Sequence, residues 1–187
     1  MIAILLTGGG SQRMGRDKAF VDWAGKPLWR HQLETLQQLE VDRIVISARP
    51  SQRFENLPDG VTVSADSADL GGALPALATI LGSMDAAEMA LIIPVDSPDL
   101  TAEFLQRGFP ADSPNGVVYQ LEGRLQPLPV LLPTVSVETI CEQVESGDLS
   151  LRGLCQKCVE RGFLEICDLD PVDAGNYRNV NRPEDFG

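Results

Sequence analysis

The chain opens with an almost uninterrupted apolar run, Ile2 to Thr7, which stops at three consecutive glycines, Gly8 to Gly10. A short run of this kind is typical of a strand buried on both faces, as in a parallel sheet covered by helices on both sides. Glycines directly after such a strand let the backbone turn and approach a ligand closely. The opening therefore predicts an α/β fold with a binding loop at the carboxyl end of its first strand.

The rest of the chain alternates strand and helix patterns to about residue 108 and is less regular after it. The further predicted strands are residues 43–48, 61–64, 89–95, 116–121, 128–132 and 163–169. The predicted helices are 27–39 with Pro27 at N1, 73–84 with Pro75 in its first turn, a short helix from a Thr101 cap to Gln106, 134–145 and 150–160, followed by a polar tail at 176–186. Alternation of this kind is typical of a mostly parallel sheet with helices on both faces. We therefore expect one domain over residues 1–187, with a three-layer α/β/α, Rossmann-like architecture.

The charge balance limits the partners. The chain carries 27 Asp and Glu against 15 Lys and Arg, a formal net charge of −12. A nucleic-acid surface needs clustered positive charge, so we expect no nucleic-acid partner. The first 30 residues are the exception, with five basic residues against two acidic ones beside the glycines. This local balance predicts a compact anion as ligand, with a solvated basic loop as the alternative.

The apolar runs are short. The longest, such as Ile2 to Leu6 and Ala90 to Pro94, fall far below the roughly 20 residues that span a bilayer. The first residues also lack the basic region and cleavage site of a secretory signal. The sequence therefore predicts a cytoplasmic protein with no membrane partner.

Residues 5–18, with the sequence LLTGGGSQRMGRDK, form the most informative motif. The backbone N–H groups of a glycine loop, with Arg13 and Lys18 nearby, can cradle phosphate oxygens. The motif is neither G-x-G-x-x-G nor a P-loop, because Lys18 follows Asp17 and no Ser or Thr comes after it to hold magnesium. The motif thus predicts an anion loop that is not of the Rossmann dinucleotide or P-loop type.

The pattern L-x-G-G-x-S-x-R-M-G-x-D-K, followed by Gly25-Lys26-Pro27-Leu28, resembles the signature of nucleotidyltransferases with the glycosyltransferase-A-like fold. Within that group the chain is most similar to the molybdenum cofactor guanylyltransferases. Three later stretches fit the resemblance in order, namely residues 65–67 (ADS), 94–98 (PVDSP) and 179–185 (NVNRPED). The resemblance spans nearly the whole chain and implies a fold like that of the nucleotide-diphospho-sugar transferases.

This resemblance implies an enzyme that transfers GMP from GTP to molybdopterin, releases pyrophosphate and uses Mg²⁺. It implies catalytic roles for Lys18, Asp96 and Arg13, with Asp96 as the metal ligand. The predicted nucleotide-binding set is Leu6, Thr7, Gly8, Gly9, Gly10, Ser11, Lys18, Ser47, Asp66, Asp96, Asn179 and Asn181. The expected partners are GTP, molybdopterin or the molybdenum cofactor, and molybdoenzymes that accept the product. We expect the protein to be a monomer.

Asp96 is also a candidate on physical grounds. It directly follows a buried strand, so it lies at the carboxyl end of the sheet, where open α/β sheets bind ligands. Magnesium needs only one or two carboxylates beside phosphate oxygens and water, and amide oxygens of Asn179 and Asn181 can complete its shell. Lys18 and Arg13 can hold the triphosphate in line, so no covalent nucleophile is required. The alternative for Asp96 is a cap or turn role, since Asp-Ser-Pro is good turn chemistry.

Two stretches depart from the family pattern. Residues 72–76 read GALPA where the family typically has Gly-Pro-Leu-Ala-Gly, and Gln126 stands before Pro127 where the family often has His-Pro. Both changes lie outside the loop that holds the triphosphate. The alternatives within the class are a cytidylyltransferase for the same cofactor and a nucleotidyltransferase for another phosphorylated acceptor. The altered stretch at 72–76 adds a non-catalytic nucleotide-binding protein as an alternative from another class.

The four cysteines raise a different alternative. Cys155-x-x-Cys158, with Cys141 and Cys167, can be interpreted as a four-thiolate zinc site. However, Cys155 and Cys158 fall on the apolar stripe of the predicted helix at 150–160, and the sequence holds no second C-x-x-C. We therefore expect these two thiols to pack in the core.

Overall fold

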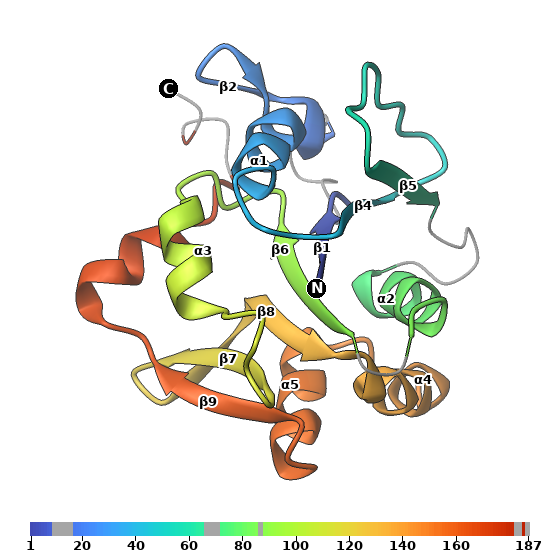
Figure 1. Cartoon of the computed structure of the whole chain (residues 1–187), viewed down its shortest axis with the longest axis vertical. Coiled ribbons are helices and arrows are strands. Elements are labelled where there is room, and N and C mark those ends of the chain that lie inside the picture. The colour runs from blue at the N-terminus through green and yellow to red at the C-terminus, as the bar shows by residue number, and fades with distance from the viewer. Residues whose placement is uncertain (9–16, 66–71, 86–87, 182–184, 186–187) are drawn as a thin grey trace.

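The central element is a seven-stranded sheet with the order β5-β4-β1-β6-β8-β7-β9 (Figure 1). The computed structural model describes residues 1–8, 17–65, 72–85, 88–181 and 185. The strands of the sheet are β1 (Ile2–Leu6), β4 (Arg43–Ala48), β5 (Val61–Ala65), β6 (Met89–Pro94), β7 (Gly116–Leu121), β8 (Arg124–Pro133) and β9 (Leu164–Asp168). Strand β1 pairs in parallel with β4 and β6, β4 with β5, and β7 with β9, whereas β8 runs antiparallel to β6 and β7. The predicted mostly parallel sheet is confirmed.

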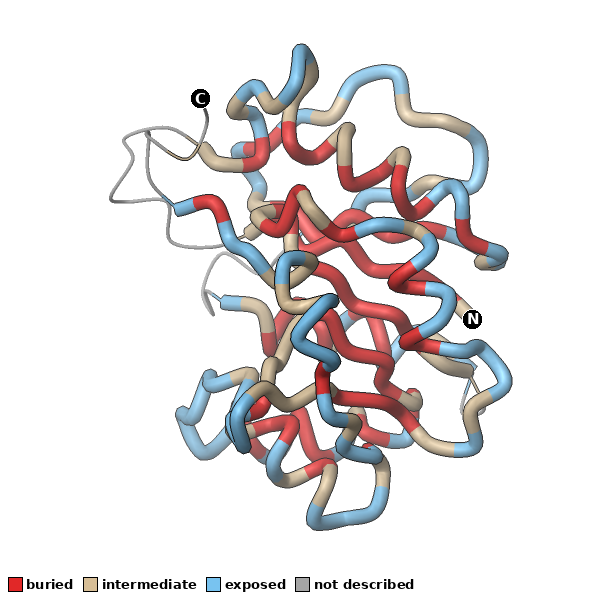
Figure 2. The backbone as a smooth tube through the Cα atoms, turned by 90° about the vertical axis from the view of Figure 1, so that its left-hand side faces the viewer, coloured by how far each residue is buried: buried red, intermediate tan, exposed pale blue. Residues whose placement is uncertain are grey.

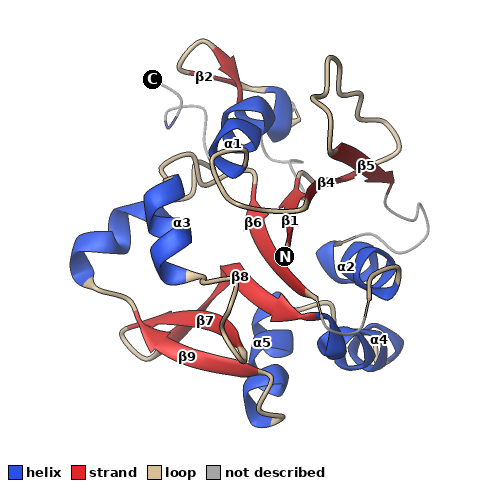
Figure 3. Ribbon diagram, in the orientation of Figure 1, coloured by secondary structure: helices blue, strands red, loops and turns tan. Residues whose placement is uncertain are grey.

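Helices cover both faces of this sheet (Figure 3). The helices are α1 (Leu28–Leu36), α2 (Ala73–Gly82), α3 (Ala102–Gly108), α4 (Val137–Glu145) and α5 (Leu151–Glu160). One core cluster contains buried side chains of α1 and α3, and the other contains buried side chains of α2, α4 and α5. This arrangement confirms the expected α/β/α layers. Among the described residues, no helix is both long and apolar enough to cross a membrane.

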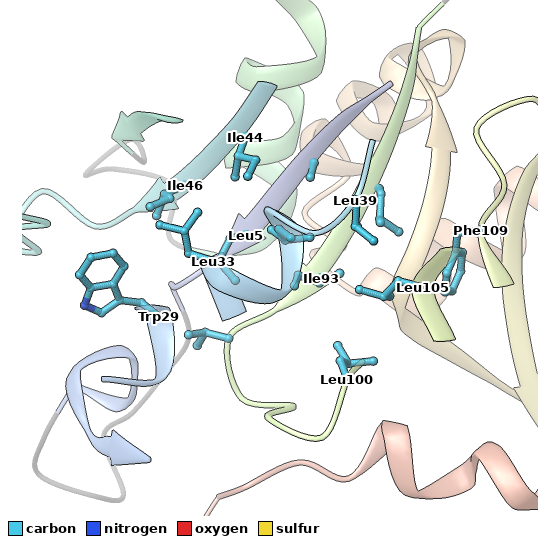
Figure 4. Close-up of a cluster of buried hydrophobic side chains, with 14 of the residues drawn as sticks. Leu5, Trp29, Leu33, Leu39, Ile44, Ile46, Ile93, Leu100, Leu105 and Phe109 are labelled. Atoms are coloured by element: carbon cyan, nitrogen blue, oxygen red, sulfur yellow. The ribbon is translucent and has the colours of Figure 1, made fainter. Parts of the chain in front are cut away.

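Strand β1 shows why its sequence is apolar throughout. Ala3 and Leu5 belong to the cluster with α1 and α3, whereas Ile2, Ile4 and Leu6 belong to the cluster with the other helices. Successive side chains of a strand point to opposite faces, so a strand covered on both sides has no position left for a polar residue. Figure 4 shows the first of these clusters, with Leu5 and Leu33 among the labelled side chains. Figure 2 shows that burial concentrates in the central strands and the inner sides of the helices.

The sequence does not predict several short elements around the first helix and the tail. These are the 3-10 turn η2 (Lys18–Phe20), the hairpin of β2 (Asp22–Trp23) with β3 (Lys26–Pro27), and η4 (Pro171–Tyr177). The predicted helix 134–145 consists of the 3-10 turn η3 (Thr134–Ser136) followed directly by α4. Pro27 ends β3 and is the N-cap of α1 rather than its first residue, with φ −60° and ψ 143°. The prediction is off by one position. The fixed φ of proline suits both the N-cap and the first helical position, so the residue type does not distinguish them. Thr101 caps α3 as predicted, accepting a hydrogen bond from Phe104 N at 3.1 Å.

Strand β8 begins at Arg124 and not at Leu128 as the sequence predicts. Its pairing with β7 shifts register between Val118 and Tyr119, which leaves residues 127–129, a Pro-Leu-Pro segment, as a bulge. Proline has no N–H to donate to a ladder, so a bulge is where a strand can hold it. The strand therefore continues on both sides of the prolines, and the bulge carries Leu128 toward the cavity described below.

The cysteines test the zinc alternative. Cys155 and Cys158 are buried in the cluster beneath α5, as predicted, whereas Cys141 is exposed. Burial raises the pKa of the Cys155 thiol to about 12 and that of Cys158 to about 11. Both thiols are therefore protonated near neutral pH and pack as apolar groups. Within the described residues, no three His, Cys, Asp or Glu side chains gather into a possible metal cluster.

We expect a thiol-specific disulfide reagent at pH 8 to modify Cys141 rapidly and to leave Cys155 and Cys158 intact until the protein unfolds. The reason is twofold, since the two buried thiols are inaccessible and their raised pKa keeps them protonated at that pH. The measurement is the number of reacted thiols over time, with and without denaturant. Rapid modification of both buried thiols in the folded protein would contradict the packing interpretation.

Candidate nucleotide-binding site

A cavity of about 300 Å³ lies at the carboxyl ends of β1 and β6. Six predicted site residues line it, namely Leu6, Thr7, Gly8, Lys18, Asp96 and Asn181. The other lining residues are Ala73, Pro94, Val95, Leu128 and Leu151. The cavity thus combines a polar side, formed by the strand ends and the tail, with an apolar side from α2, α5 and the β8 bulge. This is the edge where an open α/β sheet binds ligands.

Lys18 joins two parts of the polar side. Its Nζ donates to Asp96 Oδ2 at 2.9 Å and to Asn181 Oδ1 at 2.6 Å. The Lys18 and Asp96 side chains keep exposed fractions of only 15% and 26%, so their charges act in a partly desolvated place. Coulomb interactions are stronger there than in bulk water. The three groups therefore form one charged cluster that faces the cavity.

The position of Asp96 is fixed by the backbone around it. Val95 N donates to Leu6 O at 3.0 Å, which continues the contact between β1 and β6 past the end of β6. Val180 N donates to Asp96 O at 2.8 Å, and this bond brings the tail that carries Asn181 against the same loop. On the other side of the loop, Gln32 of α1 donates a hydrogen bond from Nε2 to Ser97 O. The loop after β6 is thus held by the first strand, the first helix and the tail together.

The donor set fits a magnesium ion. Asp96 Oδ2 and Asn181 Oδ1 already converge on a single cationic group, the Lys18 ammonium. Both are oxygen donors, and Mg²⁺ prefers oxygen, needing only one or two carboxylates when phosphate and water complete its shell. Asn179 differs, because its Oδ1 accepts a hydrogen bond from Ser97 Oγ at 2.6 Å and the residue does not line the cavity. Asn179 therefore stabilises the loop after β6 through Ser97, and it does not face the cavity.

The other predicted binding residues lie in different places. Ser47 is buried at the end of β4, and its carbonyl accepts hydrogen bonds from Thr7 N at 3.1 Å and Thr7 Oγ1 at 2.7 Å. Lys26 pairs with Glu34, and Arg30 donates to Glu55 O at 2.9 Å, so these two early basic residues are used outside the cavity. The remaining predicted residues, Gly9, Gly10, Ser11, Arg13 and Asp66, lie outside the described residues.

Sequence reasoning missed a buried group next to this cluster. Gln52 is 6% exposed, and its amide bonds to both Thr7 and Asp17. Arg49 Nη2 donates to Asp17 Oδ2 at 2.7 Å. Asp17 stands in the quoted motif, but neither Arg49 nor Gln52 follows a periodic pattern that would mark it. Their only signal is a place shortly after a predicted strand, where ligand-binding edges occur.

The fold is an α/β fold with a cavity at the carboxyl edge of its sheet, the place where open α/β sheets bind nucleotides. The model of the family described as the MobA-like NTP transferase domain matches residues 3–161, and the chain belongs to that family.

Two relatives that are similar in sequence are both named molybdenum cofactor guanylyltransferase. The chain is 30% identical over 189 residues to a molybdenum cofactor guanylyltransferase of Ectopseudomonas mendocina, a match that covers 97% of this chain and 87% of that protein. It is 31% identical over 185 residues to a molybdenum cofactor guanylyltransferase of Pseudomonas aeruginosa, covering 97% and 90% of the two chains. These matches extend over nearly the full length of both partners.

Solved structures with the same fold are more varied. Molybdopterin-guanine dinucleotide biosynthesis protein A from Archaeoglobus fulgidus superposes with a TM-score of 0.77 at 17% identity, covering 100% of this chain and 95% of that one. The 4-diphosphocytidyl-2C-methyl-D-erythritol synthase from Anaerococcus prevotii gives a TM-score of 0.76 at 13% identity, covering 99% and 92%. At these identities the likeness establishes the fold alone.

Proposed function

We propose that this protein transfers GMP from GTP to molybdopterin with release of pyrophosphate, in a Mg²⁺-dependent reaction. The observation that carries the proposal is the convergence of Lys18, Asp96 and Asn181 on one cavity at the carboxyl edge of the sheet. The guanylyltransferase names of the full-length sequence relatives support guanine over cytosine as the base. Molybdopterin is the proposed acceptor because the names of these relatives specify the molybdenum cofactor.

The chemistry requires little covalent help. The phosphate of the acceptor is itself a nucleophile, so the protein has to hold it in line with the α-phosphate and to stabilise the charge that develops on the pyrophosphate. The Lys18 ammonium supplies a point charge for the phosphates. Asp96 and Asn181 would hold the metal through their side-chain oxygens. Nucleotidyltransferases of this family work with a divalent ion, and Mg²⁺ would neutralise phosphate charge when bound.

The apolar side of the cavity and the cysteines bear on the acceptor and on the compartment. The apolar side of the cavity, with Ala73, Leu128 and Leu151, offers a surface for a flat ring system. All four cysteines are free thiols, which agrees with a cytoplasmic protein because disulfides are rare in that reducing compartment. We further propose one domain over 1–187 that acts as a monomer and passes its product to molybdoenzymes, with no nucleic-acid or membrane partner.

A melting experiment tests the nucleotide part of the proposal. We expect GTP with Mg²⁺ to raise the melting temperature, because a ligand that binds only the folded state stabilises it, by about 2.7 kcal/mol at 100 times Kd. For a chain of this size that corresponds to roughly 5 to 10 °C. The measurement compares GTP, ATP, CTP and UTP at equal concentration, each with and without Mg²⁺. Equal shifts for all four nucleotides, or no shift with any, would count against a guanine site.

A further inference from the structure

We propose that Gln52 is a positioning residue for Lys18. Its buried side-chain amide fastens Asp17, the residue directly before Lys18, to the ends of two strands. The inference rests on the proposed function in one respect, namely that Lys18 acts on the phosphates. No sequence motif and no role proposed above includes Gln52.

The amide of Gln52 uses both of its ends. Oε1 accepts from Arg49 N at 2.7 Å and from Thr7 Oγ1 at 3.0 Å. Nε2 donates to Thr7 O at 3.2 Å and to Asp17 Oδ2 at 3.0 Å. These contacts involve both ends of the amide, and the single hydroxyl hydrogen of Thr7 is shared between Gln52 Oε1 and Ser47 O. Thr7 follows β1 and Arg49 follows β4, so one side chain ties both strand ends to Asp17.

The chemistry of the partners fixes the direction of the amide. A backbone N–H of Arg49 can only donate, and the carbonyl of Thr7 can only accept. A flipped amide would place oxygen against the Thr7 carbonyl and against the Asp17 carboxylate. With Gln52 only 6% exposed, an unpaired polar group at this position would be costly. Gln52 therefore links Thr7, Arg49 and Asp17 through directed hydrogen bonds.

Asp17 passes this constraint to Lys18. Its Oδ1 accepts from Ala19 N at 3.1 Å and so caps the turn η2, which begins at Lys18. Arg49 Nη2 holds the other carboxylate oxygen, Oδ2, at 2.7 Å. The backbone of Lys18 is thus fixed from one side, while its Nζ reaches Asp96 and Asn181 on the other. A lysine side chain has four flexible bonds, so a fixed starting point limits where its ammonium can lie.

The first test needs no ligand. The chain has three lysines, Lys18, Lys26 and Lys157, so labelling lysine Cε with ¹³C gives a spectrum that lysine substitutions can assign. Gln52→Glu keeps the size of the side chain but replaces the donor by an acceptor that faces the Asp17 carboxylate. We expect the Lys18 signal to move while the Lys26 and Lys157 signals stay in place. Gln37→Glu adds the same charge at an exposed position and should move none of the three.

The second test asks whether Gln52 acts through Lys18. Affinity is measured for whichever of GTP, ATP, CTP or UTP binds the parent best, with Mg²⁺, in the parent, Gln52→Glu, Lys18→Ala and the double variant. We expect Gln52→Glu to weaken binding about tenfold in the parent and less than twofold in the Lys18→Ala background, because coupled residues are not additive. A loss that arose from general destabilisation would be similar in both backgrounds.

The outcomes separate the two proposals. An unmoved Lys18 signal in folded Gln52→Glu protein, or equal losses in the two backgrounds, overturns the positioning role. A preference for CTP, or absence of nucleotide binding, contradicts the proposed function and leaves the ligand-free spectrum as the test of Gln52. If Gln52→Glu does not fold, Gln52→Met replaces it in both tests, since it keeps the length of the side chain and removes the hydrogen bonds to Thr7 and Asp17.

Discussion

Replacing Lys18 with alanine should slow pyrophosphate release from GTP by roughly 100-fold, because loss of one preorganised group that stabilises developing charge commonly has that effect. The affinity for GTP should also fall, since in the proposed function the ammonium faces the phosphates in the ground state as well. The fold should survive, because the side chain belongs to no hydrophobic cluster and its partners, Asp96 and Asn181, border the cavity.

The measurement is turnover and GTP affinity in the same preparation, with the melting temperature of the ligand-free protein as a folding control. Lys157→Ala is the matched control, since it removes the same charge from α5 at a residue that does not line the cavity. We expect it to behave like the parent. A Lys18→Ala protein that binds and turns over GTP normally would mean that this cluster does not hold the phosphates.

Asp96→Asn should separate binding from catalysis. It keeps size and shape, and the bond from Val180 N to Asp96 O involves only the backbone, so the loop and the docked tail should persist. In the proposed function Asp96 holds the metal ion, so the loss of charge should weaken that hold, which matters most when negative charge builds up on the leaving pyrophosphate. We expect turnover to fall by roughly 100-fold, with GTP affinity changing by only about threefold, a pattern typical of lost transition-state stabilisation.

The readouts are the rate at saturating GTP, the GTP dissociation constant and the Mg²⁺ dependence of the rate. Asp112→Asn removes an equal charge from an exposed loop and should leave all three unchanged. A higher Mg²⁺ requirement in the Asp96 variant is part of the expected result. Near-normal turnover in a folded variant would remove Asp96 from the metal site and turn attention to Asn181 and Asp66.

Much of the fold could be predicted because its signals are local. The apolar run of β1 reflects burial on both faces, and the amphipathic stripe that carries Cys155 and Cys158 reflects burial on one. The strand β8 was predicted too short, because Pro127 and Pro129 look like strand breakers. Both prolines lie in a bulge of β8, where its pairing with β7 shifts register, and the sequence of β8 alone does not reveal that bulge.

The site was only partly accessible to such reasoning. Lys18 lies 78 positions before Asp96 and 163 before Asn181, and no periodicity connects residues so far apart. Their grouping came from the family resemblance and from the rule that ligands bind at the carboxyl ends of strands. Gln52 had only the second signal, its place shortly after β4, because a glutamine in a loop becomes informative only when its hydrogen-bond partners are seen.

The central claim is guanylyl transfer to molybdopterin, and a turnover assay tests it most directly. Purified protein is incubated with molybdopterin, Mg²⁺ and each of GTP, CTP, ATP and UTP, and the released pyrophosphate is measured. We predict release with GTP at least about tenfold faster than with the other three, and release that requires molybdopterin and stops when the metal is chelated. Equal or faster release with CTP, or no release from GTP in the presence of molybdopterin, would contradict the account.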